Sequence, residues 1–455
     1  MAQIINFNFV RNFFLKGHER TIRAKKNITV SFLCRGLSIV ISFLIIPLTL
    51  GYVGKVEYGI WMTISSIIQW FAFFDIGLGN GLRTKLAEAL ALNDKHTARV
   101  YISSVFAIIT VIATFMFIGF FIGGYFISWN IVLNTSLVTN YELFKIVITV
   151  FFFFCMGFVL SLVSSILQAM QKYALNDIIG LIAQLLGLVA IFILVKTTKS
   201  SLFYLCLIYG CKSAIVLFFA SIILFLGSLK KYRPTIKYIN IKKALPLISL
   251  GVKFFIAQLF YLIVTQTAVI LVVQFFGPEE VTVYNLAVRY MSMTAMGYLM
   301  ILTPFLSAFT EAYTKGEFEW IKVTIRRINW IWAAASTITI FMVFFYSLFF
   351  KLWVGNAITV PLSLIVALAI SSIIGMLNGT YGLFLNGIGK IHIQLYILGF
   401  QALLYFPLSY FFYKLGFGLA SIVVVQIIFN FFGTYIIYSQ YKKIVNQKAK
   451  GIWIK

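Results

Sequence analysis

The sequence predicts an all-α polytopic membrane protein. Hydrophobic residues make up 61% of its 455 residues, charged residues only 11%, and the mean hydropathy is +0.98. A soluble domain of this length could not bury so much apolar surface, and continuous apolar runs such as Ile148–Cys155 favour helices over the alternating strands of a β-barrel. The net charge of +25 lies mostly in short loops and termini, where it sets topology, so nucleic-acid binding is not expected.

Twelve apolar segments are long enough to cross a hydrocarbon core about 30 Å thick, which takes roughly 20 helical residues. We expect them at residues 28–50, 58–80, 100–128, 144–167, 177–196, 201–227, 247–276, 282–306, 328–353, 359–384, 391–413 and 417–440.

Lys and Arg in the connections lie mostly on one side of these spans, so the positive-inside rule predicts that both termini are cytoplasmic. The basic linker 228–246 divides the spans into two lobes of six helices. The predicted domains are a basic cytoplasmic N-terminal segment at 1–27, an N-lobe at 28–227, the cytoplasmic linker at 228–246, a C-lobe at 247–440 and a basic cytoplasmic tail at 441–455.

The N-terminal segment is too polar to be a cleavable signal peptide. Residues 4–15 interleave Phe and Ile with Arg11, and Lys16 follows, which fits an interfacial helix on anionic lipid. A frayed basic tail explains the same pattern equally well.

The two lobes show a weak internal correspondence. Arg35 lies about seven residues into the first span and Lys253 about six into the seventh, and each of these spans ends near a glycine, Gly54 and Gly277. Because each lobe has an even number of spans, a repeat would be related by an axis along the membrane normal.

Four cations lie inside apolar segments, and each costs roughly 2.5–3.5 kcal/mol at the centre of a bilayer. They are Arg35, Lys212, Lys253 and Arg289. Intramembrane charges usually face a bundle interior or a water-filled cavity. We therefore expect these residues to line a cationic cavity that binds an anionic substrate.

Each cation also has a simpler interpretation. Arg35 could pair with Asp75, which lies at a similar predicted depth, and Lys253 could extend its stem to the cytoplasmic surface. Arg289 could pair with Glu280 near the outer surface. Lys212 is near the predicted midplane, where it cannot reach the surface and must find a cavity or a partner.

Asp75 is the acid that the sequence places deepest in the spans, and it is the candidate for ion or proton coupling or for a salt bridge. Gly77, Gly79 and Gly81 follow it. Alternating glycines can let a backbone approach a phosphate, but a helix terminus is the commoner reason for them.

Nothing in the sequence indicates catalysis, a cofactor or a metal site. The three histidines lie in or beside predicted cytoplasmic connections, and no metalloprotease or Walker motif is present. The four cysteines lie in apolar runs without metal-ligand spacing, so we expect them to pack in the core.

Two patches resemble bacterial lipid-linked oligosaccharide flippases, the O-antigen and polysaccharide transporters of the MATE-like superfamily. The first is PLTLGYVGKVEYGIW at residues 47–61 with FFDIGLGNGLR at 73–83 and KLAEA at 85–89, and the second is FGPEEVTVYNLAVR at 276–289. Elsewhere the likeness is in span number, length and charge.

The resemblance implies a two-lobed transporter of the bacterial cell membrane. It would move an undecaprenyl-pyrophosphate-linked oligosaccharide from the cytoplasmic to the outer leaflet by alternating access. It also implies a cation-lined cavity, to which Arg35, Lys212, Lys253 and Arg289 would contribute, contact with membrane lipids, Na⁺ or H⁺ coupling, and glycan polymerase or ligase partners.

Two alternatives stay open. A MATE-like exporter of another small molecule would be expected to carry more acidic residues in its cavity. A membrane polysaccharide polymerase or ligase would be expected to carry a long outer loop with functional arginines, whereas the longest predicted outer connection, 129–143, has neither Arg nor Lys.

Overall fold

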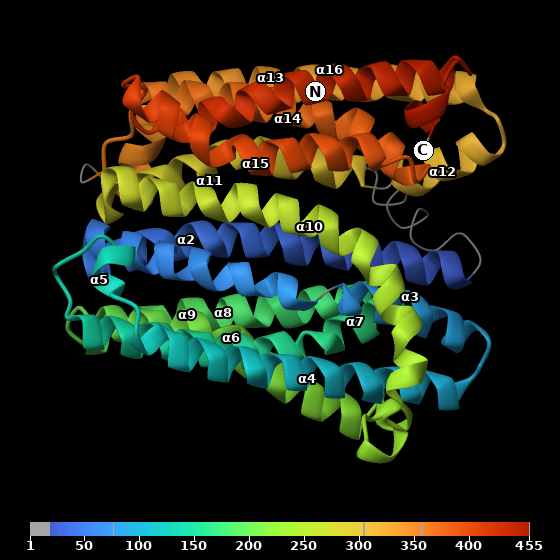
Figure 1. Cartoon of the computed structure of the whole chain (residues 1–455), viewed down its shortest axis with the longest axis horizontal. Coiled ribbons are helices and arrows are strands. Elements are labelled where there is room, and N and C mark those ends of the chain that lie inside the picture. The colour runs from blue at the N-terminus through green and yellow to red at the C-terminus, as the bar shows by residue number, and fades with distance from the viewer. Residues whose placement is uncertain (1–18, 76, 304, 356–357, 455) are drawn as a thin grey trace, which may run out of the picture. The chain divides into compact units, whose positions relative to one another are not determined.

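The computed structural model describes residues 19–75, 77–303, 305–355 and 358–454, and this part of the chain is helical, without strands (Figure 1). Side chains are described from Thr29 onward, except those of residues 73, 91, 242–258, 261 and 307. The predicted segment 4–15 lies outside the described residues. Nine helices of the described chain are long and apolar enough to cross a membrane.

The chain divides into two compact units. The first comprises the described residues up to Gly54, Ala72–Ser128 and Val138–Phe255; the second comprises Lys55–Phe71, Trp129–Leu137 and the described residues from Ile256 onward. The units differ from the predicted lobes, 28–227 and 247–440, in that two short segments from the first half of the chain belong to the second unit. The lobes themselves stay a prediction.

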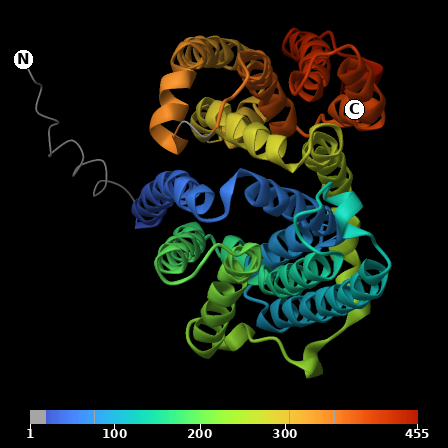
Figure 2. The same ribbon diagram turned by 90° about the vertical axis from the view of Figure 1, so that its left-hand side faces the viewer.

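In the first unit, α4, α6, α8 and α9 run side by side, as the end-on view also shows (Figure 1, Figure 2). The helices that begin in this unit or lie wholly within it are α2 (Glu19–Gln69), α3 (Leu78–Ala91), α4 (Lys95–Tyr125), α6 (Asn140–Leu160), α7 (Leu162–Ala169), α8 (Tyr173–Thr197), α9 (Leu202–Leu226) and α10 (Ile241–Phe276). Two short 3₁₀ turns, η2 (Lys230–Tyr232) and η3 (Ile236–Tyr238), join α9 to α10.

In the second unit, α14 packs on α16, α11 and α13. The elements that lie wholly in this unit are α5 (Trp129–Val132), α11 (Pro278–Leu302), α12 (Phe305–Thr314), α13 (Phe318–Val354), α14 (Leu362–Gly387), α15 (His392–Lys414), α16 (Ala420–Val445) and the 3₁₀ turn η4 (Gly451–Ile454).

Each unit has its own core. Leu82, Leu86, Ile102 and Leu167 are fully buried among α3, α4 and α7 in the first unit. Phe309 and Phe384 are fully buried in the second. Away from these cores large apolar side chains are exposed, among them Phe115 at 72% and Phe344 at 76%, as expected of surfaces that face lipid.

Helix ends follow local chemistry. The Asp94 side chain accepts a hydrogen bond from the Thr97 amide at the start of α4, and the Thr97 hydroxyl and amide lower the pKa of this carboxyl. Thr139 and Glu142 form a reciprocal capping box at the start of α6.

Every predicted span overlaps a described helix, but several boundaries differ. The first two spans form one long helix, α2, which passes Pro47 and is interrupted at Gly54, where φ is 78° and ψ is 176°. α11 begins at Pro278 and α13 at Phe318, earlier than predicted, and α12 lies in what the sequence suggested was a connection. Charged residues in the first turns of α11 and α13 and within α12 lower the local hydropathy, but they do not prevent helix formation.

Gly54 and Gly277, which the sequence pairs as the ends of corresponding spans, share one backbone conformation. Gly277 has φ 89° and ψ 169°, a region that only glycine adopts readily. The residues after the two glycines meet within the second unit, where Lys55 Nζ lies 2.9 Å from Glu279 Oε1 and the Thr282 hydroxyl donates to the Lys55 carbonyl at 2.6 Å.

Candidate functional site

Lys212 lines a cavity of about 300 Å³ inside the first unit, between α7, α8 and α9. It is ten residues beyond the start of α9, so it is about 15 Å from that end and further from the other. Its side chain is half-buried and cannot reach either end of the helix. Its predicted role in binding an anionic substrate stays a prediction.

The cavity combines polar and apolar walls. α8 contributes Asn176 and Gln184, while Ser164 of α7 and Ser213 of α9 add hydroxyl groups. Amides and hydroxyls can donate hydrogen bonds to an anion and accept them from sugar hydroxyls. Its remaining lining is apolar or glycine, so a bound charge would be poorly hydrated and would interact strongly with the polar side chains.

Two neighbouring residues fix the position of the Lys212 side chain. Its Nζ lies 4.6 Å from the centroid of the Tyr209 ring, and the Tyr209 hydroxyl is 3.1 Å from Thr49 Oγ1 on α2. Gly187 on α8 provides the space for the stem, because a Cβ atom there would lie 2.7 Å from Lys212 Cδ. A cation–π contact of up to about 2 kcal/mol offsets much of the insertion cost.

Arg35 pairs with Asp177, a carboxylate that the sequence analysis missed. Arg35 Nε lies 3.1 Å from Asp177 Oδ2, and the Arg35 side chain is 58% exposed while that of Asp177 is 13% exposed. Asp177 follows the cavity residue Asn176 on α8, so the pair borders the site. Arg35 lies about seven residues into the first predicted span, whereas Asp177 begins the fifth on the same predicted side, so predicted depth alone does not pair them.

Asp75 has a different role from the predicted pairing with Arg35. It ends the 3₁₀ turn η1 (Trp70–Asp75), and both its carboxylate oxygens accept from the Gly79 amide, at 3.0 and 3.2 Å. Gly77 is in the left-handed region, with φ 73°, which turns the chain into α3. A Cβ at Gly79 would lie 3.2 Å from both Asp75 and Ser165, so the glycines form a tight helix junction.

The other two predicted cavity residues lie elsewhere. Arg289 is half-buried on α11 in the second unit, about 17 Å from the start of that helix. It lies further from the start of its helix than predicted because α11 begins at Pro278. Lys253 belongs to α10, but its side chain lies outside the described residues. Of the four predicted cavity cations, Lys212 and Arg35 are therefore the two whose side chains are described in the first unit.

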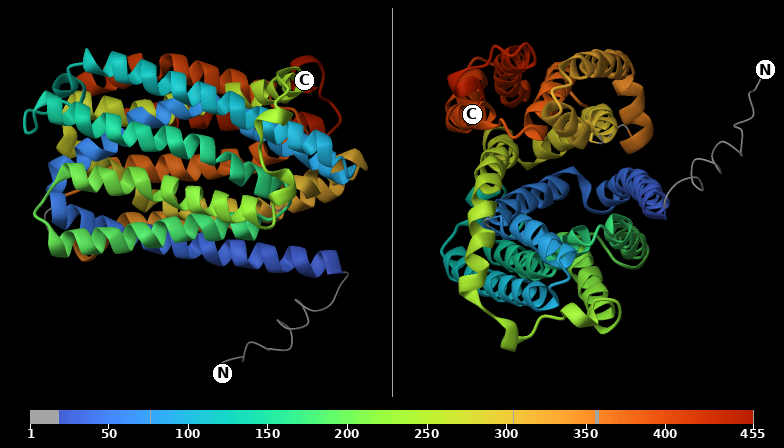
Figure 3. Two further views of the ribbon diagram at one scale, coloured as in Figure 1. Left: turned by 90° about the horizontal axis from the view of Figure 1, so that it is seen from below. Right: turned by 90° about the vertical axis from the view of Figure 1, so that its right-hand side faces the viewer.

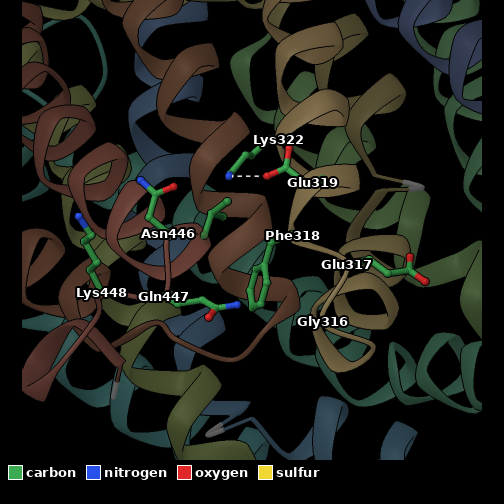
Figure 4. A pocket seen from close by; sticks show the side chains of 9 residues that line it. Gly316, Glu317, Phe318, Glu319, Lys322, Asn446, Gln447 and Lys448 are labelled. Carbon is green, nitrogen blue, oxygen red and sulfur yellow. Dashed lines mark hydrogen bonds and ion pairs between the residues drawn. The ribbon is translucent and has the colours of Figure 1, made fainter.

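A second, wider cavity of about 620 Å³ lies in the second unit, between the turn after α12 and the end of α16 (Figure 4). Glu317, Glu319, Lys322 and Lys448 contribute its charges, and Lys322 Nζ is 2.7 Å from Glu319 Oε1. Its charges balance and it lies at helix ends, so it lacks the positive, apolar surroundings of the Lys212 cavity. Among the described residues no cluster of His, Cys, Asp and Glu could hold a metal.

Comparison with solved structures identifies the fold. The chain aligns with an inward-facing multidrug resistance MATE transporter of the MOP superfamily at a TM-score of 0.68 and 16% identity, over 90% of this chain and 98% of that one. A mutant of the Vibrio cholerae MATE transporter aligns at a TM-score of 0.63 and 13% identity, over 95% and 99% of the two chains. The fold is therefore MATE-like.

Sequence comparison identifies the family. A candidate O-antigen export protein of Yersinia pseudotuberculosis is 25% identical over 382 residues, which cover 81% of this chain and 84% of that protein. Residues 24–310, more than half of the chain, match the family described as polysaccharide biosynthesis protein. The chain belongs to this family of polysaccharide biosynthesis proteins.

Proposed function

We propose that this protein is a flippase of the bacterial inner membrane. It moves an undecaprenyl-pyrophosphate-linked oligosaccharide repeat unit from the cytoplasmic to the outer leaflet by alternating access. Membership of the polysaccharide biosynthesis family, similarity to a candidate O-antigen export protein and the MATE-like fold support this assignment.

The observation that carries the proposal is the cavity around Lys212. A pyrophosphate is a compact anion, and an ammonium held over a ring within a polar, weakly hydrated cavity suits it as a point charge. The amides and hydroxyls beside it would bind the remaining phosphate oxygens or the first sugar. We propose that Arg35, Lys253 and Arg289 contribute further positive charge along the route.

The ion coupling of this transporter is a separate part of the proposal. We infer that Na⁺ or H⁺, if it drives transport, acts at Asp177. That carboxylate is nearly buried and borders the cavity. If Arg35 moves away, Asp177 can bind a proton or Na⁺ in its place. Asp75 is the weaker candidate because its carboxylate already caps the Gly79 amide at a helix junction. A glycan polymerase or ligase would then consume the flipped unit on the outer face.

The first test is a leaflet-resolved assay of lipid-linked glycan in a strain that lacks this protein. Repeat units should accumulate on the cytoplasmic face, and wild-type protein should restore surface glycan. Unpolymerised units on the outer face would instead identify a polymerase or ligase and reject the flippase.

A multidrug exporter is the second candidate, because the structural neighbours include a multidrug resistance transporter. It predicts export of organic cations by cells that express the protein. We expect no change in the efflux of a cationic dye such as ethidium, since the positive cavity repels it. Dye export that depends on Lys212 would favour the exporter.

A further inference from the structure

The connection between α9 and α10 forms an exposed surface that transport does not explain. We define the linker surface as the exposed side chains of η2, η3 and the residues beside them. They are Lys230, Lys231, Arg233, Ile236, Lys237 and Ile239. Figure 3 shows this segment in lime green beside α4.

The opposite side of the same segment is firmly attached to the first unit. Leu229 is 1% exposed and belongs to the core, against which Tyr232 packs. Ser103 accepts from the Thr235 amide at 3.1 Å, and Ser104 exchanges hydrogen bonds with the backbone of Asn240 at 2.8 and 3.2 Å. The exposure of the linker surface is therefore a property of an ordered backbone.

Arg99 and His96 of α4 complete the attachment. The Arg99 guanidinium donates to the Arg233 carbonyl at 3.1 Å and lies 4.2 Å from the centre of the Tyr238 ring, which His96 contacts edge-on. These contacts use the backbone and Tyr238 and leave the basic side chains directed outward. Ile236 is 88% exposed between them, an unfavourable position for isoleucine in water.

The neighbouring helices place this surface at a membrane interface. The exposed apolar surface of α4 includes Val111 and Phe115, and Val111 lies about 10 Å along the helix from Ser104, where the linker is attached. On α9 the exposed apolar side chains continue to Leu226, just before the linker. Both helices therefore leave hydrocarbon near the level of the linker surface, which is the depth of lipid headgroups.

We propose that the linker surface binds the headgroups of anionic phospholipids, with Ile236 and Ile239 inserted among them. Four cations beside two exposed isoleucines match a negative headgroup layer above an apolar one. With the predicted orientation, the leaflet is the cytoplasmic one. This inference does not depend on which substrate the protein moves.

Hydrogen exchange of the full chain in nanodiscs tests the proposal. Two nanodisc compositions are compared. Both are three quarters phosphatidylethanolamine, and the remaining quarter is anionic phosphatidylglycerol in one and zwitterionic phosphatidylcholine in the other. The amides of residues 230–241 should exchange about fivefold or more slowly with phosphatidylglycerol, because each cation near an anionic surface contributes about fivefold in affinity. High salt should weaken the effect.

Variants assign the effect to the linker surface. The triple variant K230Q/K231Q/K237Q should lose the difference between the two lipids, and I236S should reduce protection in both. A matched control, K442Q/K448Q/K450Q, removes the same charge near the C-terminus, in the second unit, and should leave the linker unchanged. Unchanged exchange in α4 shows that each variant is folded.

Three results would overturn the proposal. Equal exchange in both lipids, or a preference for phosphatidylglycerol that survives the triple variant, would mean that anionic lipid does not act here. If the linker is instead protected only by added polyglutamate or polyuridine, its partner is a soluble polyanion, and the lipid proposal is wrong.

Discussion

Lys212 and Arg35 are both cations on apolar helices of the first unit, yet their side chains contact different kinds of group. Arg35 is held by a carboxylate, Asp177, so much of its charge is neutralised locally. Lys212 is held over the face of Tyr209, which positions the ammonium. We propose that Lys212 presents its charge to an anionic ligand, whereas Arg35 fixes α2 to α8 and releases its charge when Asp177 is protonated or binds a cation.

The largest effect is expected for Lys212→Gln. Loss of a charge-assisted contact to the pyrophosphate should lower transport by about tenfold to a hundredfold, measured as surface glycan at equal protein abundance. Lys145→Gln is the matched control, because Lys145 also lies over a ring, Phe203, but is exposed on α6. Equal loss in both variants would show that the ammonium of Lys212 has no special role.

Exchange of the Arg35 and Asp177 charges is expected to have the next largest effect. Each single change, Arg35→Asp or Asp177→Arg, leaves two like charges close together and should lower both melting temperature and transport. The double variant should restore stability. Restored stability without restored transport would locate ion coupling at Asp177, whereas full recovery would make the pair structural.

Gly187→Ala should have a smaller effect that depends on Lys212. The new Cβ displaces the lysine stem, which is flexible, so the protein should fold normally while transport falls several-fold. Gly180→Ala is a control on the same helix and in the same cavity, since a Cβ at Gly180 has no atom within 4 Å. If the two variants behave alike, the position of the lysine stem is unimportant.

Tyr209→Phe keeps the ring beneath Lys212 and removes only the hydroxyl that contacts Thr49. Because the cation–π contact persists, we expect transport within about twofold of wild type and a slightly lower melting temperature. Tyr209→Leu is the informative companion, since it removes the ring while preserving an apolar side chain. A large loss for phenylalanine would mean that the hydroxyl itself contacts the substrate.

The smallest effect is expected for Asp75→Asn. Asparagine retains a carbonyl oxygen that can accept from the Gly79 amide, so the helix junction should persist and transport should change little. Loss of transport at normal abundance would contradict the capping role and return Asp75 to the candidates for coupling.

Sequence reasoning predicted the class and most of the spans because apolar length alone determines them. It also singled out Lys212, since a lysine in mid-helix has no route to the surface, but its role in binding substrate stays a prediction. It missed Asp177 because that residue begins a predicted span and looked like a helix end. Pairing depends on the relative depth and rotation of α2 and α8, which hydropathy does not encode.

Asp75 shows the converse limit. Its neighbours suggested either a phosphate-binding turn or a helix end, and local sequence could not separate them. The left-handed conformation of Gly77 and the close approach of Ser165 to Gly79 decide in favour of a junction. Ser165 is more than 80 residues away in the chain, so no local pattern contains that contact.

The assignment of residues 55–71 to the second unit has a consequence for biosynthesis. Ser66 donates to the carbonyl of Gln266, 200 residues later, and a side chain at Gly59 could not fit against the Pro278 carbonyl. At about 5–20 residues per second, the ribosome completes these partners roughly 10–40 s after it makes the segment. During that interval nascent residues 55–71 are in the membrane without their final neighbours, and they are where we expect an insertion chaperone or early quality control to act.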